Sequence, residues 1–513
     1  MARLKEYNGH YCESEYEYAF IGFLEAEGWK YSSGNNISRV TKRDVLIADD
    51  FKKFIADTNP DLTEDEVIQI YDNVRLVGAE SDFATLHKVY GWMVNGVQFT
   101  PQDELPRMIP LIDFDNWDKN IFRVVNQFTV EYTNNGQKEN RRPDVLLFVN
   151  GIPLCVIELK NPTDANATIY DAWEQINIRY WRDIPHLLHY CPLACISDGV
   201  KTRLGTVRTP YEHFYAWRRV NEGDVVSTLP FAETETMIKG VYTPERFVEI
   251  FRDYIYFQDS IYDCDEVEIV CRYPQFFAAK LLKQSIVNSV VTRSGKGGTY
   301  FGATGCGKTY TMAFLARQLA LRCTDIPEIG SPTIILIVDR DELQKQGSKL
   351  FTKSKEFLNL GEVSVVKNRT QLRQELGARQ SGGFYICTIQ KFCDREDDKI
   401  GLINDRQNII CFSDEAHRTQ LEHSKKIQFS KDADENMKAM VSKPYAKVLK
   451  EAFPHATFVG FTGTPIAETY QTFGDEIDRY TMDQAVADGL TVSIKYHPRI
   501  AKVLLDNKKV KEI

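Results

Sequence analysis

The stretch RRPDVLLFVNGIPLCVIELKNP, from Arg141 to Pro162, decides the fold of the first half of the chain. It contains two apolar runs around an Asn-Gly dipeptide, which is typical of the tight turn of a β-hairpin. Three charged residues, Asp144, Glu158 and Lys160, lie near the ends of this otherwise apolar stretch. Because a buried charge is costly unless another group compensates it, this pattern indicates a functional site.

The register of the hairpin decides whether the two acidic side chains meet. With a strict two-residue turn, Asp144 faces Ile157, and Glu158 then lies on the opposite face of the sheet. One extra residue between the turn and Glu158 would bring the two carboxylates to the same face. Pro153 lacks an N–H group and weakens regular pairing in this segment. We therefore predict an odd-length loop or a single β-bulge between the turn and Glu158.

In that register, Asp144, Glu158 and Lys160 form a centre suited to Mg²⁺-dependent hydrolysis of a phosphodiester. Two neighbouring carboxylates resist joint ionisation unless a cation lies between them. Mg²⁺ held by Asp144, Glu158 and the main-chain carbonyl of Leu159 would activate a water molecule. Lys160 would position that water or stabilise the additional charge on phosphorus. The alternative interpretation is an amphipathic hairpin with solvated ends.

Length and composition place the chain in a broad class. At about 150 residues per domain, 513 residues favour roughly three domains. Hydrophobic residues make up 43% and charged residues 26%, which is ordinary for a globular protein. No apolar run approaches the ~20 residues that span a bilayer, and the N-terminus does not resemble a signal peptide. The eleven cysteines include no C-x-x-C pair, so we expect reduced thiols in the cytoplasm and no zinc site. The net charge of −9 does not exclude DNA, because DNA affinity follows local patches.

The second half of the chain contains a full match to the phosphate-binding motif G-x-x-x-x-G-K-[ST]. The residues of this loop that we expect to bind ATP are Gly302, Thr304, Gly305, Cys306, Gly307, Lys308 and Thr309. The glycines allow consecutive main-chain N–H groups to face phosphate oxygens, and Lys308 would reach the β- and γ-phosphates. The hydroxyl of Thr309 would ligate Mg²⁺, and the helix that follows presents its positive end to the anion.

A second motif supports this ATP site. The apolar run over residues 409–412 predicts a buried strand, and Asp414 and Glu415 follow directly after it. Asp414 would complete the Mg²⁺ shell, and Glu415 would activate the attacking water. His417 is either a structural histidine or a relay of nucleotide state. From about residue 297, strand and helix patterns alternate, which favours a parallel sheet covered by helices.

These motifs and their order resemble the restriction (R) subunit of type I restriction–modification enzymes across essentially the whole chain. The hairpin residues match the PD-(D/E)xK nuclease pattern, and VDRDELQKQ, CTIQKF, SDEAHRTQ and GFTGTPI look like superfamily 2 helicase motifs. The resemblance implies an ATP-driven translocase on double-stranded DNA in the bacterial cytoplasm, which cuts after pumping DNA and works with methylation and specificity subunits. The alternatives are a stand-alone helicase–nuclease of repair or defence, or a catalytically silent, ATP-gated DNA-binding and assembly module.

The resemblance also implies roles for single residues in the motor. Gln275, in the segment RYPQ, falls where such motors place a glutamine that reads adenine. Thr464 would couple ATP hydrolysis to domain movement. Thr388 and Gln390 would lie near the track of the DNA backbone.

One departure from the family concerns the helix that follows the nuclease strands. The family usually carries Q-x-x-x-Y there, whereas Gln175 in this chain is followed by Arg179 and then by Tyr180. On an ideal helix Arg179 lies ~40° and Tyr180 ~140° from Gln175. Either a π-bulge inserts a residue or Arg179 takes the place of the tyrosine, and we favour Gln175 with Tyr180. We expect this helix to begin after a cap at Thr163 or Asp164.

The expected fold class is α/β, and we expect three segments. Residues 1–258 form an endonuclease domain of the PD-(D/E)xK restriction-endonuclease type with a mixed sheet, and residues 259–470 form a first RecA-like domain with a parallel sheet. Residues 471–513 form a linker and the start of a truncated second RecA-like domain. The 48 residues after Pro465 are too few for a second motor domain, so we expect an N-terminal fragment that binds ATP but hydrolyses it poorly.

Overall fold

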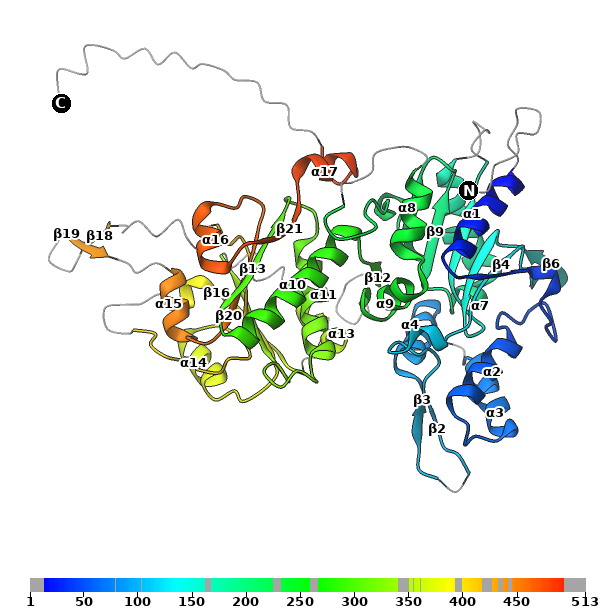
Figure 1. Cartoon of the computed structure of the whole chain (residues 1–513), viewed down its shortest axis with the longest axis horizontal. Coiled ribbons are helices and arrows are strands. Elements are labelled where there is room, and N and C mark those ends of the chain that lie inside the picture. The colour runs from blue at the N-terminus through cyan, green and yellow to red at the C-terminus, as the bar shows by residue number, and fades with distance from the viewer. Residues whose placement is uncertain are drawn as a thin grey trace, which may run out of the picture.

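The structure forms two lobes, an N-terminal lobe from α1 to α9 and a C-terminal lobe from α10 to α17 (Figure 1). It is a computed structural model that describes residues 13–78, 80–102, 104–161, 168–224, 232–258, 266–339, 350–353, 355–359, 361–392, 399–417, 427–431, 437–441 and 445–492. Each lobe is built around one large β-sheet. Within these described ranges, no helix has the length and apolar character needed to cross a membrane.

A six-stranded mixed sheet forms the core of the N-terminal lobe. In spatial order its strands are β1 (Lys30–Ser33), β4 (Phe122–Asn126), β7 (Val145–Val149), β8 (Ile152–Leu159), β9 (Leu193–Ser197) and β10 (Thr202–Thr206). The β1–β4 and β8–β9 pairs are parallel and the other pairs are antiparallel. Every residue of β7, β8 and β9 is buried, as expected for central strands covered on both faces. The expected mixed sheet is therefore confirmed.

Helices and two small hairpins surround this sheet. The helices are α1 (Glu13–Ala26), α2 (Ala48–Thr58), α3 (Glu64–Arg75), α4 (Asp82–Asn95), α5 (Ile169–Glu174), the π-helical turn η3 (Gln175–Tyr180), α6 (Trp181–Asp183), α7 (Pro185–Leu188), α8 (Ala232–Val241) and α9 (Pro244–Asp253). The short 3₁₀ turns are η1 (Gly34–Asn36), η2 (Trp117–Lys119) and η4 (Tyr211–His213). The hairpins pair β2 (Val97–Phe99) with β3 (Arg107–Ile109) and β5 (Val130–Asn134) with β6 (Gln137–Arg141).

The turn between β7 and β8 has the geometry that its Asn-Gly sequence predicts. Asn150 and Gly151 both have positive φ angles, +50° and +77°. A side chain at Gly151 would collide with the main-chain carbonyl of Ile47, so only glycine fits there. The Asn150 side chain accepts a hydrogen bond from the main-chain N–H of Ile121 at 2.8 Å. These contacts hold the tip of the hairpin against the loops around it.

The pairing of β7 with β8 contains the predicted irregularity. Next to the turn, Phe148 pairs with Pro153, but the preceding residue, Leu147, pairs with Cys155. Leu154 therefore has no partner and forms a single-residue bulge. From this point the register continues so that the two acidic positions of the hairpin lie across from each other. The prediction of one extra residue between the turn and the second carboxylate is confirmed.

A seven-stranded parallel sheet forms the core of the C-terminal lobe. In spatial order its strands are β15 (Val363–Val365), β16 (Phe384–Thr388), β14 (Thr333–Val338), β17 (Ile409–Ser413), β20 (Thr457–Thr462), β13 (Lys296–Gly302) and β21 (Glu476–Tyr480). All six neighbouring pairs are parallel. The sheet continues past residue 470, because β21 pairs with β13. A parallel sheet in this half of the chain was expected and is confirmed.

Helices cover both faces of the parallel sheet, and the strands alternate accordingly. One face packs on α10 (Tyr273–Thr292), α11 (Lys308–Arg322) and α13 (Lys355–Leu358), and the other packs on α14 (Arg369–Gly377), the turn η5 (Ile389–Phe392), α15 (Tyr445–Ala452) and α16 (Ala467–Phe473). In β14, Ile334 and Leu336 belong to the first core, whereas Ile335 and Ile337 belong to the second. The helix α17 (Met482–Ala487) follows β21, and β18 (Ile427–Lys431) pairs with β19 (Met437–Val441).

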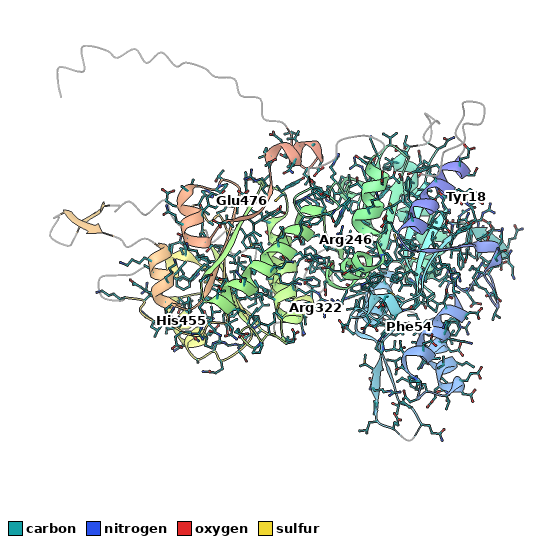
Figure 2. The ribbon with its side chains drawn as sticks, viewed as in Figure 1. Tyr18, Phe54, Arg246, Arg322, His455 and Glu476 are labelled. Carbon is teal, nitrogen blue, oxygen red and sulfur yellow. The ribbon has the colours of Figure 1, made fainter. Side chains whose placement is uncertain are left out.

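The two lobes make extensive contacts. An antiparallel pair, β11 (Ile255–Gln258) with β12 (Val267–Val270), lies between them. On α9, Arg246 lies over the rings of Phe276 and Phe277 at the start of α10, and Arg322 at the end of α11 forms an ion pair with the buried Asp253 (Figure 2). A buried ion pair also joins Arg219 to Asp478 on β21, with nitrogen–oxygen distances of 3.1 Å.

Candidate active sites

The hairpin of the N-terminal lobe brings two carboxylates together. Asp144 immediately precedes β7, and one of its oxygens, Oδ2, accepts a hydrogen bond from the main-chain N–H of Leu159 at 2.9 Å. Glu158, in β8, is completely buried. Burial, together with the neighbouring Asp144, raises the pKa of Glu158 well above its usual value, and Lys160 opposes this shift. The pair therefore resists carrying two negative charges unless a cation compensates them.

The helix that follows the hairpin begins at Ile169 and turns into a π-helix. Thr168 is its N-cap, and its main-chain N–H and hydroxyl both donate to the Asp171 carboxylate. The expected cap residues Thr163 and Asp164 lie outside the described part of the chain. The π-helical turn spans Gln175–Tyr180 and adds one residue to the helical repeat.

The π-helical turn places Gln175 and Tyr180 on the same face. Gln175 Nε2 donates to Glu158 Oε2 at 2.7 Å, and the Tyr180 hydroxyl donates to Glu158 Oε1 at 2.6 Å. Gln175 Nε2 also lies 2.9 Å from the Tyr180 hydroxyl oxygen. Arg179 is exposed and pairs with Glu174 at 2.9 Å. Of the two arrangements that the sequence left open, the structure therefore has the π-bulge with Tyr180.

Lys160 completes this cluster. Its Nζ donates to Gln175 Oε1 at 3.0 Å, and its main-chain N–H donates to the carbonyl of Ser197 on β9 at 2.8 Å. In the described ranges, no group of three or more His, Cys, Asp or Glu side chains could hold a metal ion. A metal at this centre would depend on the two carboxylates and a main-chain oxygen such as that of Leu159. Oxygen donors of this kind, beside a carboxylate with a raised pKa, fit a hard divalent cation.

The phosphate-binding loop lies between β13 and α11. Gly305 and Gly307 have φ angles of +84° and +87°, which side chains rarely adopt. A Cβ atom at Gly302 would lie 2.6 Å from the Tyr300 ring and 3.0 Å from Cys306 Sγ. Thr304 and Gly305 are exposed, Cys306 is buried, and Thr309 is half-buried in the first turn of α11. The loop thus has the open main chain and the helix N-terminus that phosphates require.

The acidic motif after β17 faces this loop. Lys308 Nζ donates to the carbonyl of Gly302 at 3.2 Å and lies 4.0 Å from Glu415 Oε1. Burial, together with the adjacent Glu415, raises the pKa of Asp414 to about 6, and Lys308 opposes this shift. Glu415 has a φ angle of +47°, a strained conformation of the kind found at functional sites. The structure therefore brings Lys308, Asp414 and Glu415 together.

A short network connects this motif to the loop GFTGTPI. His417 Nδ1 lies 3.4 Å from Glu415 Oε2 and 2.8 Å from the hydroxyl of Thr462. The same hydroxyl accepts a hydrogen bond from the main-chain N–H of Thr464 at 3.1 Å. His417 thus contacts both the acidic motif and the neighbouring loop, although its role as a relay stays a prediction.

The remaining motor residues lie near the same edge of the sheet. Gln275 is buried in the first turn of α10, and its Nε2 donates to the carbonyl of Gly307 at 3.3 Å. Thr388 ends β16, and its hydroxyl accepts a hydrogen bond from Lys391 at 3.1 Å. Gln390 is exposed and donates to the carbonyl of Asp339 at 2.7 Å. Gln275 therefore contacts the phosphate-binding loop, and the roles of the other two residues on DNA stay predictions.

Comparisons with known proteins match each lobe to a different family model. Residues 11–213 match the family model described as Type I restriction enzyme R protein N terminus (HSDR_N), and residues 274–513 match the SWI2/SNF2 ATPase model. The endonuclease subunit of the type I restriction enzyme HindI from Haemophilus influenzae is 31% identical over 509 residues, which cover 94% of this chain and 46% of that protein. A type I restriction enzyme endonuclease subunit of Staphylococcus aureus, SauCOLORF180P, is 25% identical over 475 residues, which cover 89% of this chain and 45% of that protein.

The chain spans about half the length of the curated relatives it matches. Among solved structures, the ATP-dependent Type ISP restriction-modification enzyme LlaBIII bound to DNA matches 45% of this chain and 17% of its own at 16% identity. The TM-score of that match is 0.29. The two family models and the curated relatives agree with each other: over most of its length this chain is similar to the endonuclease (R) subunits of type I restriction enzymes.

Proposed function

We propose that this chain is the nuclease and motor part of a type I restriction enzyme. In this proposal it translocates double-stranded DNA with energy from ATP, cuts it with Mg²⁺, and acts in the cytoplasm with methylation and specificity subunits. The names of the relatives and the ATPase family model support the reaction classes. The observation that carries the proposal is that Gln175 and Tyr180 both bond the Glu158 carboxylate, while Lys160 bonds Gln175.

Each residue of the N-terminal centre has a distinct task in the proposed cleavage reaction. Asp144, Glu158 and the Leu159 carbonyl would hold Mg²⁺, which when bound supplies a Lewis acid and an acidified water. The Tyr180 hydroxyl and Gln175 amide hold both oxygens of Glu158, and the tyrosine bond favours its ionised form. Lys160 would stabilise the charge that develops on the phosphorus oxygens.

The motor site would work in parallel. Lys308 would exchange its bond to the carbonyl of Gly302 for the β- and γ-phosphates, which are stronger acceptors. Thr309 and Asp414 would hold Mg²⁺ with the nucleotide, and Glu415 would orient the attacking water. Gln275 would read adenine, since its amide is already fixed beside the phosphate-binding loop.

The test is cleavage of circular DNA that carries one unmethylated recognition site. The intact subunit with its methylation and specificity partners is assayed with and without ATP, beside the variants Asp144→Ala and Lys308→Ala. We expect cutting to require ATP and to be lost in both variants, while ATP hydrolysis survives only in Asp144→Ala. Asp57→Ala and Lys53→Ala, which remove an exposed pair on α2, are matched controls and should cut normally. Cutting without ATP or without partners would instead indicate a free-standing nuclease.

A further inference from the structure

The hairpin of β5 and β6 stands at the outer edge of the N-terminal lobe, on the side away from the motor (Figure 1). It forms a two-stranded sheet of its own, separate from the six-stranded sheet. Val130 at its start is buried, whereas residues 133–138 around its tip are all exposed. A Cβ atom added at Gly136 would meet nothing within 4 Å. A hairpin with so little packing is only marginally stable by itself, so contacts at its base must hold it in place.

The hairpin is nevertheless a regular ribbon up to its tip. Five residue pairs join the two strands, and the turn residues Asn135 and Gly136 have φ angles of +47° and +79°, as in a tight hairpin turn. The Tyr132 hydroxyl donates to Glu139 Oε2 at 2.6 Å, and Asn134 Nδ2 donates to Glu139 Oε1 at 2.9 Å. Five residues of strand extend over ~17 Å. The lobe thus presents a straight, exposed ribbon of about that length.

The base of the hairpin is connected to both halves of the nuclease centre. Arg141 ends β6, and Asp144 follows three residues later, a distance that the chain spans with at most ~11 Å. The Arg141 guanidinium also pairs with the buried Asp183 at 2.6 Å. Asp183 lies three residues after Tyr180, whose hydroxyl donates to Glu158. The elements that position the two carboxylates therefore also position the hairpin.

Cationic side chains gather around the base of the hairpin, although the whole chain has a net charge of −9. The main-chain N–H of Glu131 on β5 donates to the carbonyl of Lys42 at 3.0 Å, which places the loop with Lys42 and Arg43 beside the hairpin. Burial, together with the nearby Arg43, lowers the pKa of His186 on α7 to about 4, so Arg43 also lies close to the helix that follows Asp183. The cationic residues of this region are Lys42, Arg43, Lys138, Arg141, Arg142 and Arg182.

The carboxylates of the same region are already engaged within it. Glu131 lies 3.8 Å from Lys138, and the Asp183 carboxylate is shared by Arg141 and Arg182. Glu139 accepts the two hydrogen bonds from within the hairpin described above. Lys42, Arg43 and Arg142 are exposed. Among the described residues around the hairpin, positive charge therefore exceeds negative charge.

We propose that the hairpin β5–β6 is a DNA-binding wing, whose tip enters a groove of the duplex that lies at the nuclease centre while the cations at its base bind the flanking phosphates. The major groove is ~12 Å wide and accepts a two-stranded β-ribbon. Cation–phosphate contacts hold DNA without reading its sequence, which suits a nuclease that cuts away from a recognition site. The exposed amides of Asn134, Asn135 and Gln137 at the tip can donate to base edges and accept from them.

This inference rests on the proposed nuclease function. It adds that the DNA to be cut is held by the nuclease lobe itself, at a fixed position relative to Asp144 and Glu158, and not by the motor alone.

The first test detects the phosphate contacts through their dependence on salt. Binding of the intact subunit to a short fluorescent duplex is followed by fluorescence anisotropy at several salt concentrations, without divalent cations, so that no strand is cut. Each phosphate contact contributes ~0.9 to the slope of log affinity against log salt concentration. We expect Arg142→Ala and Lys138→Ala each to reduce this slope by ~0.9. Lys53→Ala is the matched control, because Lys53 is also exposed and paired with a carboxylate but lies on α2, and it should leave the slope unchanged.

The second test shortens the wing without changing its register. The deleted residues are Thr133, Asn134, Gln137 and Lys138, so that Tyr132 and Glu139 flank the same Asn-Gly turn. Because two residues leave each strand, every remaining side chain keeps its face. In the complex with the methylation and specificity subunits, we expect cleavage to slow by about a hundredfold, the order of loss that misplacement of a substrate causes. ATP hydrolysis and the Mn²⁺ affinity of the nuclease centre should be unchanged.

The third test identifies what the tip touches. A photo-cross-linking amino acid replaces Gln137 in one variant and Met108 in another, because Met108 is an exposed residue of the other small hairpin, β2–β3. In the complex with DNA and ATP, we expect a cross-link to DNA from position 137 and none from position 108. A cross-link from position 137 to the methylation or specificity subunit in place of DNA would mean that the hairpin docks a protein, and the proposal would be wrong.

The outcomes separate this inference from the proposed function. If the unaltered complex does not cut DNA with ATP and Mg²⁺, or if Asp144→Ala cuts as fast, the proposed nuclease itself is wrong. If the unaltered complex cuts as proposed, but the shortened hairpin cuts at the same rate and Arg142→Ala keeps the full salt slope, the nuclease stands and the wing is wrong. A loss of Mn²⁺ affinity in the shortened chain would indicate damage to the centre, and the salt slope and the cross-link then decide.

Discussion

The two candidate centres of this chain use similar side chains but are assembled in different ways. In the motor, Asp414 and Glu415 are adjacent in sequence and follow the end of a regular strand, so local sequence is enough to position them. In the nuclease centre, Glu158 obtains its partners from a strand with a bulge and from a helix with a π-turn. The nuclease centre therefore depends on two irregularities in secondary structure, whereas the acidic pair of the motor follows a strand that pairs regularly with both of its neighbours.

Both irregularities have the same geometric effect, because each absorbs a single extra residue. In a strand, one additional residue turns every later side chain to the opposite face, and the bulge at Leu154 removes that change. In a helix, one additional residue rotates later side chains by ~100°, and the π-turn removes that rotation. Glu158 thus keeps both Asp144 and Tyr180 as neighbours. The predictions below test this dependence in order of decreasing expected effect.

The largest effect is expected from a second extra residue in β8. An alanine inserted between Leu154 and Cys155 would move Glu158 to the opposite face of the sheet, because the bulge can absorb only one residue. We expect the Mn²⁺ affinity of this centre, measured by electron paramagnetic resonance, to fall sharply. The loss should exceed the roughly 10–100-fold loss of metal affinity that follows removal of a single outer-shell partner. ATP binding should be unchanged. An alanine inserted into the exposed Asn135-Gly136 turn is the control, and equal Mn²⁺ affinity in both variants would refute the dependence on register.

Two titratable groups, one in each lobe, should change the stability of the folded chain in opposite directions as the pH falls. Burial lowers the pKa of His186 to about 4. As the pH falls, the unfolded chain therefore binds the proton before the folded chain does, and the contribution of His186 to the stability of the N-terminal lobe is lost between about pH 6.5 and pH 4. The raised pKa of Asp414, about 6, acts in the opposite sense, because the folded state binds the proton first and gains stability as the pH falls from about 6 to 4. Each contribution is on the order of 3 kcal/mol.

Tryptophan fluorescence can follow the N-terminal lobe, because all six tryptophans precede residue 218 and only Trp217 among them also packs on α10, at Tyr273, Phe276 and Phe277. Hydrogen exchange in β17 follows the C-terminal lobe. His186→Gln should flatten the first pH profile and Asp414→Asn the second. Substitutions that leave both profiles as steep as in the unaltered chain, measured without Mg²⁺, would contradict the assignment.

A smaller effect is expected from the loss of one hydrogen bond at the nuclease centre. Tyr180→Phe removes the hydroxyl that donates to Glu158 and favours its ionised form. A hydrogen bond to a charged group is worth roughly 1.5–3 kcal/mol, so we expect Mn²⁺ affinity to fall about tenfold. Tyr211→Phe, measured by the same titration, should have no effect. An unaltered Mn²⁺ affinity in Tyr180→Phe would show that the hydroxyl does not support the carboxylate.

The smallest effect is expected from removing the residue that the π-turn absorbs. Deletion of Arg179, which is exposed, leaves Gln175 and Tyr180 four residues apart, as in the usual Q-x-x-x-Y arrangement. A regular α-helix would then place both side chains on Glu158, and we expect Mn²⁺ affinity within about twofold of the unaltered value. Replacement of Arg179 by alanine is the control for loss of its ion pair. A large loss of affinity on deletion alone would mean that the π-turn has a role beyond absorbing a residue.

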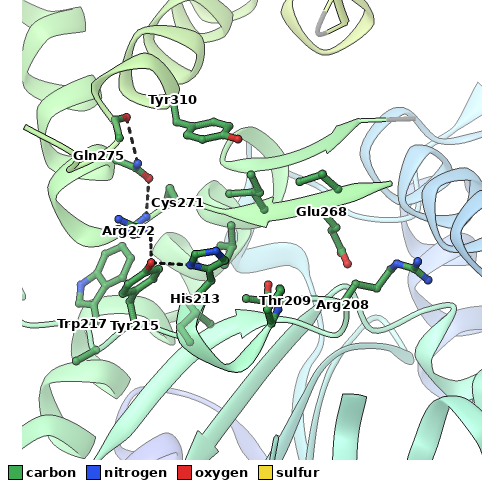
Figure 3. Close-up of a pocket in the computed structure, with 18 of the residues that line it drawn as sticks. Arg208, Thr209, His213, Tyr215, Trp217, Glu268, Cys271, Arg272, Gln275 and Tyr310 are labelled. Atoms are coloured by element: carbon green, nitrogen blue, oxygen red, sulfur yellow. Dashed lines mark hydrogen bonds between the residues drawn. The ribbon is translucent and has the colours of Figure 1, made fainter. Parts of the chain in front are cut away.

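Sequence patterns predicted the nuclease centre because strand and helix periods are local properties. The positions of Asp144, Glu158 and Tyr180 along their elements required one bulge and one π-turn, and both are present. A cavity lies between the lobes beside the phosphate-binding loop (Figure 3). It could not be predicted in this way, because Tyr215 and Gln275, which both line it, meet only through packing of separate elements. Glu268 alternates with apolar neighbours in β12, which is the pattern of a solvent-facing position, yet it is buried.

The buried pair of Arg219 and Asp478 has a consequence for how this protein can evolve. The two residues belong to different lobes and are separated by most of the motor in sequence, yet each needs the other to compensate its charge. Removing one partner of such a pair typically costs ~3–5 kcal/mol, a large part of the stability of a domain. A recombination event that exchanges one lobe between relatives would therefore be viable only if it carried a matching partner. A designed chimera of the two lobes must therefore transfer both residues together.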